Sequence, residues 1–175
     1  MKIISSVEKL NNKLFTVSED HAVDPSGFEI KRFIVYHRGS AVMMPVDERR
    51  RVLLVRQFRL PAQRFLWELP AGSIDPGEKP LQTAKRELKE ETGYRAKNWK
   101  KLISFFPSPG FLTEKMTIFL ATGLTAGVAT PMGDERIETR WFSAKEIEAA
   151  IDEGEIVDAK TMLGYFFWKR SQRKG

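Results

Sequence analysis

The sequence predicts an α+β fold, in which a mixed sheet carries helices on its faces. Three observations support this class. Alternating or β-branched runs fill the first third of the chain and recur later, a strongly polar helix interrupts them at 80–92, and few helices follow the last strand. Because the 175 residues contain no repeat, no low-complexity tract and no dividing linker, we expect a sizeable core.

Breaks such as "NN" (11–12) and "DPSG" (24–27) separate the predicted strands of the N-terminal half. These strands lie near 2–8, 13–19, 29–36, 40–45, 51–59 and 64–70. The helix at 80–92 follows, with Pro80 suited to its first turn and Gly93 to its end.

The C-terminal half predicts fewer strands and two more helices. Strands are expected near 100–106, 116–122 and 138–142. A helix over 143–154 begins with a serine cap, and the last helix covers 158–170. The apolar face of that last helix is expected in the core rather than against a cofactor, and it consists of Met162, Leu163, Phe166 and Phe167.

Composition narrows the function classes. The chain is 42% apolar and 30% charged, as expected for a soluble globular protein, and it contains no cysteine, which excludes disulfides, thiolate metal sites and a cysteine nucleophile. We find no signal-peptide pattern and no apolar stretch of membrane-spanning length, so we expect a cytoplasmic protein without a membrane partner.

The net charge of +6 leaves several interpretations open. It fits a nucleic-acid binder, a basic solvated surface, or local attraction for a small anion. Because the basic residues are spread along the chain and do not alternate with aromatic residues in one stripe, nucleic acid is not the expected partner.

The helix at 80–92 places three carboxylates close together. Glu87 and Glu91 are four residues apart and share a face, which Glu90 flanks. We expect Arg86 and Lys89 to sit around the helix rather than between the glutamates. The pattern fits either a solvated acidic face or a site for a divalent hard cation such as Mg²⁺, which prefers oxygen ligands.

The loop before this helix favours the cation site. The stretch "LPAGSIDPGE" (69–78) contains two glycines and two prolines and is therefore expected to be structured. Gly72 lets a ligand approach the main chain closely. A strand, a glycine-containing loop and a glutamate-rich helix together predict a cage of oxygen ligands.

These residues resemble the Nudix box, G-x5-E-x7-R-E-U-x-E-E-x-G-U, at every fixed position. The matching residues are Gly72, Glu78, Arg86, Glu87, Leu88, Glu90, Glu91, Gly93 and Tyr94. The resemblance implies a Nudix α/β/α sandwich with a mixed central sheet and a small N-terminal antiparallel sheet. It also implies a hydrolase domain over 39–175 and an N-terminal β-sheet region, 1–38, used for dimerisation and substrate binding.

The resemblance further implies Mg²⁺- or Mn²⁺-dependent hydrolysis of a nucleoside diphosphate linked to another moiety. By the same resemblance, Glu87 and Glu91 look like the principal metal ligands, with Glu90 as a further ligand and the carbonyl of Ala71 as a backbone ligand. Glu78 and Arg86 look like a structural ion pair that attaches the loop to the helix.

Three stretches outside the box resemble the ADP-ribose pyrophosphatase branch of this family. They are "VRQFRLP" with "WELPAG", "SPGFLTEKMTIFLA" with its Pro109, and "GDERIETRWFS". The branch takes its general base from the last stretch, which makes Glu135 the candidate, with Asp134 and Glu138 as reserves. Gly133 stands where the branch often has a glutamate, so Glu90 or Glu91 remains open for this role. The alternative interpretation of the stretch is a solvated acidic turn without a catalytic role.

Four residues are candidates for substrate binding. Arg59 resembles the branch's diphosphate-facing arginine, and Arg38 is a second candidate, since an arginine fork binds phosphate oxygens in pairs. Glu114 is expected to accept a ribose hydrogen bond or to position water, and Phe111 to stack on a base. Phe111 as a core residue and Arg38 as a surface residue remain the alternatives.

The same branch implies a homodimer that exchanges N-terminal strands, which would cover the edges of a small sheet. The leading activity is conversion of ADP-ribose to AMP and ribose 5-phosphate. The alternatives are hydrolysis of another nucleoside-diphosphate sugar such as GDP-mannose, a non-catalytic nucleotide sensor, and an RNA-end hydrolase. No G-x-S-x-G elbow and no P-loop pattern occurs in the sequence.

Overall fold

The computed structural model describes residues 1–130 and 136–172. By its backbone contacts the chain divides into two compact units. The first unit comprises 1–39 with 105–116, and the second comprises 40–104 with 117–175.

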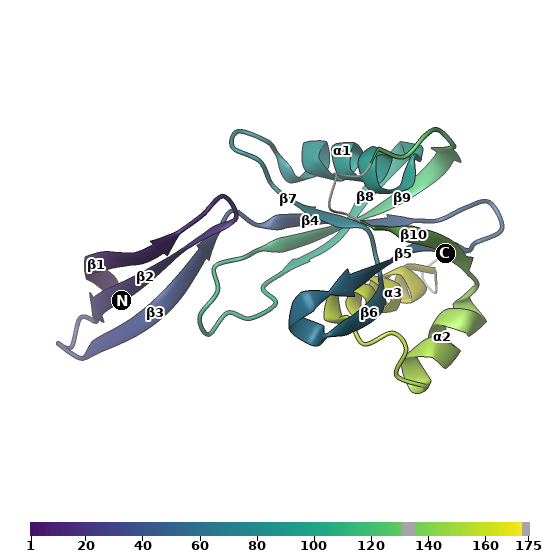
Figure 1. Ribbon diagram of the computed structural model, residues 1–175. Coiled ribbons are helices and arrows are strands. Elements are labelled where there is room, and N and C mark those ends of the chain that lie inside the picture. Colours follow the sequence, from purple (N-terminus) through teal and green to yellow (C-terminus); the bar gives the residue numbers. More distant parts are fainter. Residues whose placement is uncertain (131–135, 173–175) are drawn as a thin grey trace. The chain divides into compact units, whose positions relative to one another are not determined.

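The first unit is built on a three-stranded antiparallel sheet in the order β1-β2-β3 (Figure 1). Its strands are β1 (Lys2–Asn11), β2 (Phe15–Val23) and β3 (Glu29–His37). The segment 105–116 joins β3 through a parallel bridge between Val35 and Leu112 and through Val35 N–H, which donates to the carbonyl of Phe111 at 2.7 Å. A stretch far along the sequence therefore completes this unit.

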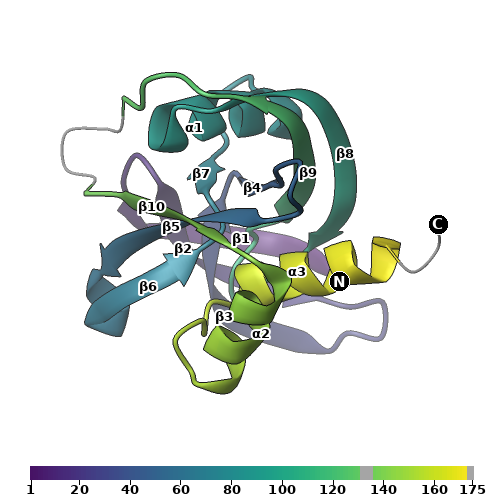
Figure 2. The same ribbon diagram turned by 90° about the vertical axis from the view of Figure 1, so that its right-hand side faces the viewer.

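The second unit contains two sheets, in the orders β10-β5-β6 and β7-β4-β9-β8. The strands are β4 (Ser40–Pro45), β5 (Val52–Arg59), β6 (Arg64–Glu68), β7 (Ala71–Ser73), β8 (Arg95–Phe105), β9 (Met116–Thr125) and β10 (Glu138–Phe142). The helices are α1 (Pro80–Thr92), α2 (Ala144–Asp152) and α3 (Ala159–Gln172), with a 3₁₀ turn at Leu60–Ala62. Both views show α1 on one side of the sheets and α2 and α3 on the other (Figures 1 and 2).

Helix α1 packs on β4 and β9 through small and aliphatic side chains. Ala84 and Leu88, four residues apart on one helix face, are both fully buried. They belong to one apolar cluster with Ala41, Met43, Phe119 and Ala121. Because cores pack this densely, the helix has little freedom to slide over the sheet, and its carboxylates are held at one end of β4.

The α+β class is confirmed, and the helix predicted at 80–92 has those bounds. Three features differ from expectation. The predicted core face of α3 is wrong, because Tyr165 and Trp168 are the large buried apolar side chains of this helix and Phe166 is 55% exposed. β7 is too short for a periodicity signal and forms because it pairs with β4 at Ala71↔Val42 and Gly72↔Ala41. β8 starts at Arg95 rather than near 100, because the only apolar residues of this strand before 100 are Ala96 and Trp99, whose spacing of three does not give the alternation used to find strands. Among the described residues no helix is long and apolar enough to span a bilayer.

Candidate active site

The main chain of the predicted site runs from β7 through a loop into α1, and hydrogen bonds fix both ends of this segment. Met43 N–H donates to the carbonyl of Pro70 at 2.9 Å, and β7 then continues along β4. Pro80 opens α1, and the side-chain amide oxygen of Gln82 accepts a hydrogen bond from Lys79 N–H at 2.8 Å. The strand is thus attached by backbone hydrogen bonds, and the start of the helix is capped by a side chain.

Gly72 permits an unusually close approach between β7 and α1. A Cβ atom at position 72 would lie 2.0 Å from the carboxyl carbon of Glu87 and 2.1 Å from its Oε1. The glutamate therefore occupies the space that any other residue's side chain would need. Any side chain here would have to displace the flexible Glu87 carboxylate, and glycine instead leaves that carboxylate lying directly against the strand backbone.

Arg86 forms the predicted ion pair with Glu78. Its Nε donates to Glu78 Oε1 at 3.1 Å and its Nη2 to Oε2 at 3.0 Å. The hydrogen bonds from Arg86 lower the pKa of Glu78 to about 2, although partial burial works in the opposite direction. This pair attaches the loop to the helix, as expected from the sequence.

The expectation that Arg86 sits beside the glutamates rather than between them is wrong. Its Nη1 donates to Glu87 Oε1 at 2.7 Å and to Glu90 Oε2 at 3.1 Å. The side chain reaches these carboxylates because Glu87 is adjacent and Glu90 is one helical turn further on. One guanidinium thus offsets the repulsion between two of the three carboxylates.

Glu91 lies on the packed face of α1. It is three residues beyond Leu88 and is 4% exposed, with its Oε2 atom fully buried. A buried carboxylate is costly unless a hydrogen bond or a cation compensates it. Its position on the inward face is consistent with the metal-ligand role that the box resemblance implies.

Arg59, at the end of β5, forms a two-pronged ion pair with Glu68 at the end of β6. Nε and Nη2 donate to the two carboxylate oxygens, each at 2.8 Å. The hydrogen bonds that Arg59 donates to Glu68 raise the pKa of Arg59, and burial opposes this. The negative charges of Glu68 and, further down in size, Glu91 add to the rise. The structure therefore brings Arg59 within the electrostatic reach of the carboxylate helix.

The other three predicted substrate residues lie in the first unit. Arg38 Nη2 donates to the carbonyl of Lys13 at 2.9 Å, and Arg38 lines a cavity of about 280 Å³. Glu114 approaches His37 Nδ1 at 3.8 Å. Phe111 is 52% exposed, so it is not a core residue. The roles of these residues in binding substrate stay predictions.

The predicted base Glu135 and its reserve Asp134 lie outside the described residues. Glu138, the other reserve, is on β10, where its carboxylate accepts a hydrogen bond from Arg56 at 3.2 Å. Its side chain is largely exposed.

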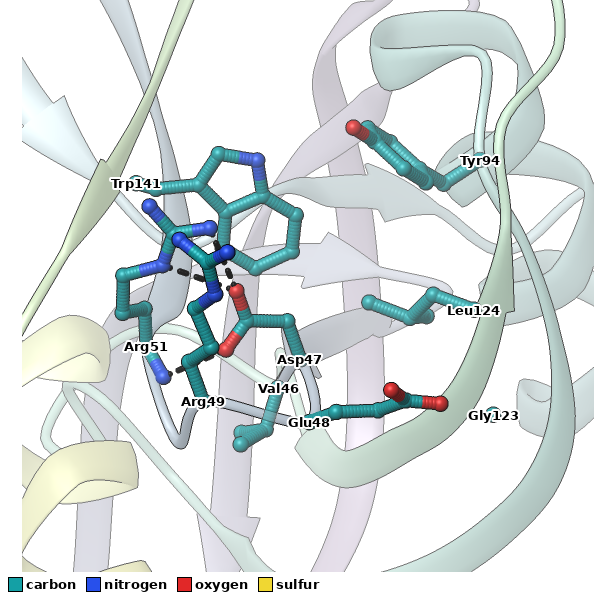
Figure 3. Close-up of a pocket in the computed structure, with 9 residues that line it drawn as sticks. All are labelled: Val46, Asp47, Glu48, Arg49, Arg51, Tyr94, Gly123, Leu124 and Trp141. Atoms are coloured by element: carbon teal, nitrogen blue, oxygen red, sulfur yellow. Dashed lines mark hydrogen bonds and ion pairs between the residues drawn. The ribbon is translucent and has the colours of Figure 1, made fainter.

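A separate cavity of about 390 Å³ lies at the opposite end of β5 (Figure 3). Figure 3 shows Asp47 and Arg51 facing each other beside Trp141, with Tyr94 across the cavity. Because a strand rises about 3.3 Å per residue, Arg59 is more than about 20 Å along β5 from this cavity. The two acidic and two basic side chains of the lining balance in charge, which does not favour a diphosphate.

Helix α1 carries the oxygen ligands that a divalent cation prefers, but its carboxylates are not arranged around a common metal position. Within 1–130 and 136–172, no group of three or more His, Asp or Glu side chains is arranged to hold a metal ion. Glu87, Glu90 and Glu91 nevertheless supply only oxygen donors, and the space at Gly72 accommodates Glu87 against the strand. Binding at Glu87 and Glu90 requires that Arg86 Nη1 give up its present contacts.

The sequence did not point to Glu68 and Lys160. Lys160 Nζ donates to Glu68 Oε2 at 2.5 Å, and both residues are buried. A charged residue inside the otherwise apolar "FLWELP" was the available signal for Glu68. The partner of Glu68 could not be read from the sequence, because it lies on a helix 92 residues later.

Comparisons with known proteins show the family of this chain. The NUDIX domain model matches residues 35–163. An ADP-ribose pyrophosphatase of Bacillus subtilis (strain 168) is 35% identical over 162 residues, which cover 91% of this chain and 88% of the relative. A GDP-mannose pyrophosphatase of Cronobacter sakazakii (strain ATCC BAA-894) is 36% identical over 140 residues, which cover 74% and 73% respectively. The crystal structure of an ADP compounds hydrolase matches with a TM-score of 0.83 at 20% identity, covering 99% of this chain and 94% of the other, and so shows the same fold.

Replacement of Gly72 by alanine is expected to weaken divalent-cation binding by about tenfold or more, because the new methyl group must displace the Glu87 carboxylate. Mn²⁺ titration followed by electron paramagnetic resonance measures this directly. Gly110→Ala is the control, since a Cβ at position 110 meets no atom within 4 Å. Equal Mn²⁺ affinity in Gly72→Ala and the wild type would contradict the assignment of Glu87.

The Glu78–Arg86 pair predicts a pH-dependent contribution to stability. Because the pKa of Glu78 is lowered from 4.5 to about 2, the pair stabilises the fold above pH 4.5 and loses this effect as the pH falls towards 2. The difference in free energy of unfolding between wild type and Glu78→Gln should therefore shrink over that interval in urea titrations. A difference that stays constant from pH 7 to pH 2 would show that the ion pair does not stabilise the protein.

Proposed function

The chain belongs to the Nudix family, and we propose that it hydrolyses the pyrophosphate bond of ADP-ribose to give AMP and ribose 5-phosphate. The observation that carries this proposal is the position of the box helix, whose Glu87 carboxylate lies against the backbone at Gly72. The relative from Bacillus subtilis, similar over most of both chains, supports the choice of ADP-ribose.

The chemistry must overcome the negative charge of the diphosphate. Nudix hydrolases generally depend on a divalent metal, and we propose Mg²⁺, with Mn²⁺ as a substitute, held by Glu87, Glu90, Glu91 and the carbonyl of Ala71. A cation held by these groups would supply positive charge that offsets the charge of the phosphates and would make a water molecule easier to deprotonate. Arg59 contributes further donors to the same oxygens.

A general base must remove a proton from the attacking water. We propose Glu135 for this role, with Glu90 or Glu91 as the alternative. Glu90 is partly exposed and is bound to Arg86 Nη1, whereas Glu91 is buried. A base within the metal-binding carboxylates would need no contribution from the loop before β10.

Substrate selection is assigned to Arg38, Phe111 and Glu114. Phe111 has an exposed ring suited to stacking on a nucleobase, and Arg38 and Glu114 follow two stretches that are hydrogen-bonded to each other, since His37 N–H donates to Thr113 Oγ1 at 2.9 Å. The guanidinium of Arg38 suits a phosphate, and the carboxylate of Glu114 suits the hydroxyl groups of a ribose.

A second candidate substrate is GDP-mannose, favoured by the similarity to the pyrophosphatase of Cronobacter sakazakii. The corner from Trp67 to Ala71 and the box would serve either substrate, so the difference would lie in the residues that contact base and distal sugar. A purely sensing role would not require Glu87, Glu90 and Glu91 together. Hydrolysis of RNA ends has only the basic net charge in its favour.

Apolar side chains on the first unit support a homodimer. Val7 on β1 and Phe33 on β3 both lie in the cross-strand row of Glu19, on one sheet face, and are 52% and 60% exposed. Ile3, Ile4, Leu10 and Phe28 are also at least half exposed. Apolar surface on a small sheet with two edge strands favours a second copy of the chain as its cover. We also retain the cytoplasm as the proposed location.

Glu91→Gln is expected to lower kcat on ADP-ribose by about a hundredfold or more, because the amide removes a metal-binding charge without changing the side-chain shape. Product identification with ADP-ribose, GDP-mannose, UDP-glucose, NADH, diadenosine polyphosphates and capped RNA fixes the substrate. The exposed Glu155→Gln should retain full activity, and circular dichroism should show that both variants are folded. Full activity of Glu91→Gln would refute the metal assignment, and a wild type that prefers another member of the panel would refute ADP-ribose.

Phe33→Glu is expected to weaken dimerisation by about tenfold or more, since it places a second carboxylate beside Glu19 in an apolar contact surface. Light scattering coupled to size-exclusion chromatography measures the mass. Lys97→Gln lowers the net charge by the same single unit on the exposed part of β8 and serves as the control. A wild type that elutes as a monomer at all concentrations would exclude the dimer.

A further inference from the structure

The ion pair between Arg59 and Glu68 belongs to a larger buried network. Glu68 is 2% exposed, and its Oε2 accepts hydrogen bonds from both Arg59 Nη2 and Lys160 Nζ. Burial alone would raise the pKa of Glu68, but the two cations lower it, so the carboxylate is charged at neutral pH. Three donors therefore fix the position of this carboxylate.

Lys160 is itself held at the start of α3. Its Nζ lies 3.0 Å from Asp158 Oδ2, and this aspartate caps the helix by accepting from Thr161 N–H at 3.0 Å. Two cations, Arg59 and Lys160, thus face the two anions Glu68 and Asp158. The network is balanced in charge, which reduces the cost of burying its members.

Thr161 connects the N-terminus of α3 to the backbone that leads into β7. Its hydroxyl donates to Asp158 Oδ2 at 2.5 Å and accepts from Leu69 N–H at 2.7 Å. Leu69 directly follows Glu68 and stands two residues before Ala71. The N-terminus of α3 therefore fixes both the side chain of Glu68 and the strand that leads into Ala71.

The network determines which part of Arg59 is available to a ligand. Nε and Nη2 are used by Glu68, whereas Nη1 makes no hydrogen bond to any described residue. The Arg59 side chain is 40% exposed although its partner is buried. A guanidinium held along one edge loses less conformational entropy when its other edge binds phosphate.

We propose that Glu68 and Lys160 are positioning residues, which orient Arg59 so that its Nη1 edge meets a phosphate of the substrate. Helix α3 thereby takes part in substrate binding without contacting the substrate. The inference rests on the proposed function, since it requires Arg59 to bind the diphosphate. A merely structural ion pair would affect stability but not KM.

A double-mutant cycle tests the proposal with whichever substrate of the panel the wild type hydrolyses. Glu68→Gln places an amide nitrogen against one of the Arg59 donors, so KM should rise about tenfold while kcat changes less than about threefold. Lys160→Met should raise KM in the same direction, and it carries the test if Glu68→Gln does not fold. In an Arg59→Ala background, each substitution should change KM by less than about twofold, because the guanidinium through which both residues act is absent.

Glu148→Gln is the matched control. It breaks the ion pair in which Lys169 Nζ lies 2.9 Å from Glu148 Oε1 and which also links α3 to the rest of the unit. This substitution should leave KM unchanged. A rise in KM for Glu148→Gln equal to that for Glu68→Gln would overturn the proposal, since general loosening of α3 would explain both. Effects of Glu68→Gln and Arg59→Ala that multiply, or an unchanged KM in Glu68→Gln, would overturn it as well.

Proton exchange at Arg59 Nε separates this inference from the proposed function. Measured by NMR in the wild type, Glu68→Gln and Lys160→Met, it reports the hold on Arg59 without any substrate. Faster exchange in both variants supports positioning, and unchanged exchange overturns it. A wild type that hydrolyses no member of the panel refutes the proposed function alone, and the exchange rates then decide the positioning of Arg59.

Discussion

The absence of a side chain at position 72 is the constraint on which the site depends. Helix α1 is fixed to β4 and β9 through Ala84 and Leu88, so it cannot retreat from the neighbouring strand. The Glu87 carboxylate then fills the volume that a Cβ at residue 72 would take. Core packing on one side of the helix therefore sets how closely its acidic side approaches a strand backbone.

Given that approach, the charges must be balanced locally, and Arg86 does so in two ways. Its contact with Glu78 uses two nitrogens and lowers the pKa of that carboxyl group, so it anchors the loop. The contacts with Glu87 and Glu90 use only Nη1. A cation that binds the latter pair can therefore replace one nitrogen while the anchor stays in place. Arg86 thus uses Nε and Nη2 for the contact that fixes the loop, and only Nη1 for the contacts that a cation can replace.

The sequence predicted what local spacing encodes. Glu87, Glu90 and Glu91 could be assigned to one region of a helix because their separations match the helical period, and Gly72 because the box fixes its distance from them. The place of Arg86 Nη1 depends on a side-chain conformation, which spacing does not specify. Lys160 meets Glu68 only through the tertiary fold, and β7 exists only because β4 lies beside it. Interactions of this kind leave no periodic pattern in the chain.

The division of the chain also separates two kinds of residue. The carboxylates and Arg59 belong to the unit that contains α1, whereas Arg38, Phe111 and Glu114 belong to the unit built on β1, β2 and β3. The segment 105–116 lies between β8 and β9 in the sequence but belongs to the first unit, so it carries Phe111 and Glu114, which are predicted to bind substrate. If Phe111 and Glu114 bind substrate as proposed, substitutions in this segment change the preferred base or sugar while the contacts of Gly72 stay intact. Similar relatives named for different substrates, ADP-ribose and GDP-mannose, are the expected result, since a fold does not determine its substrate.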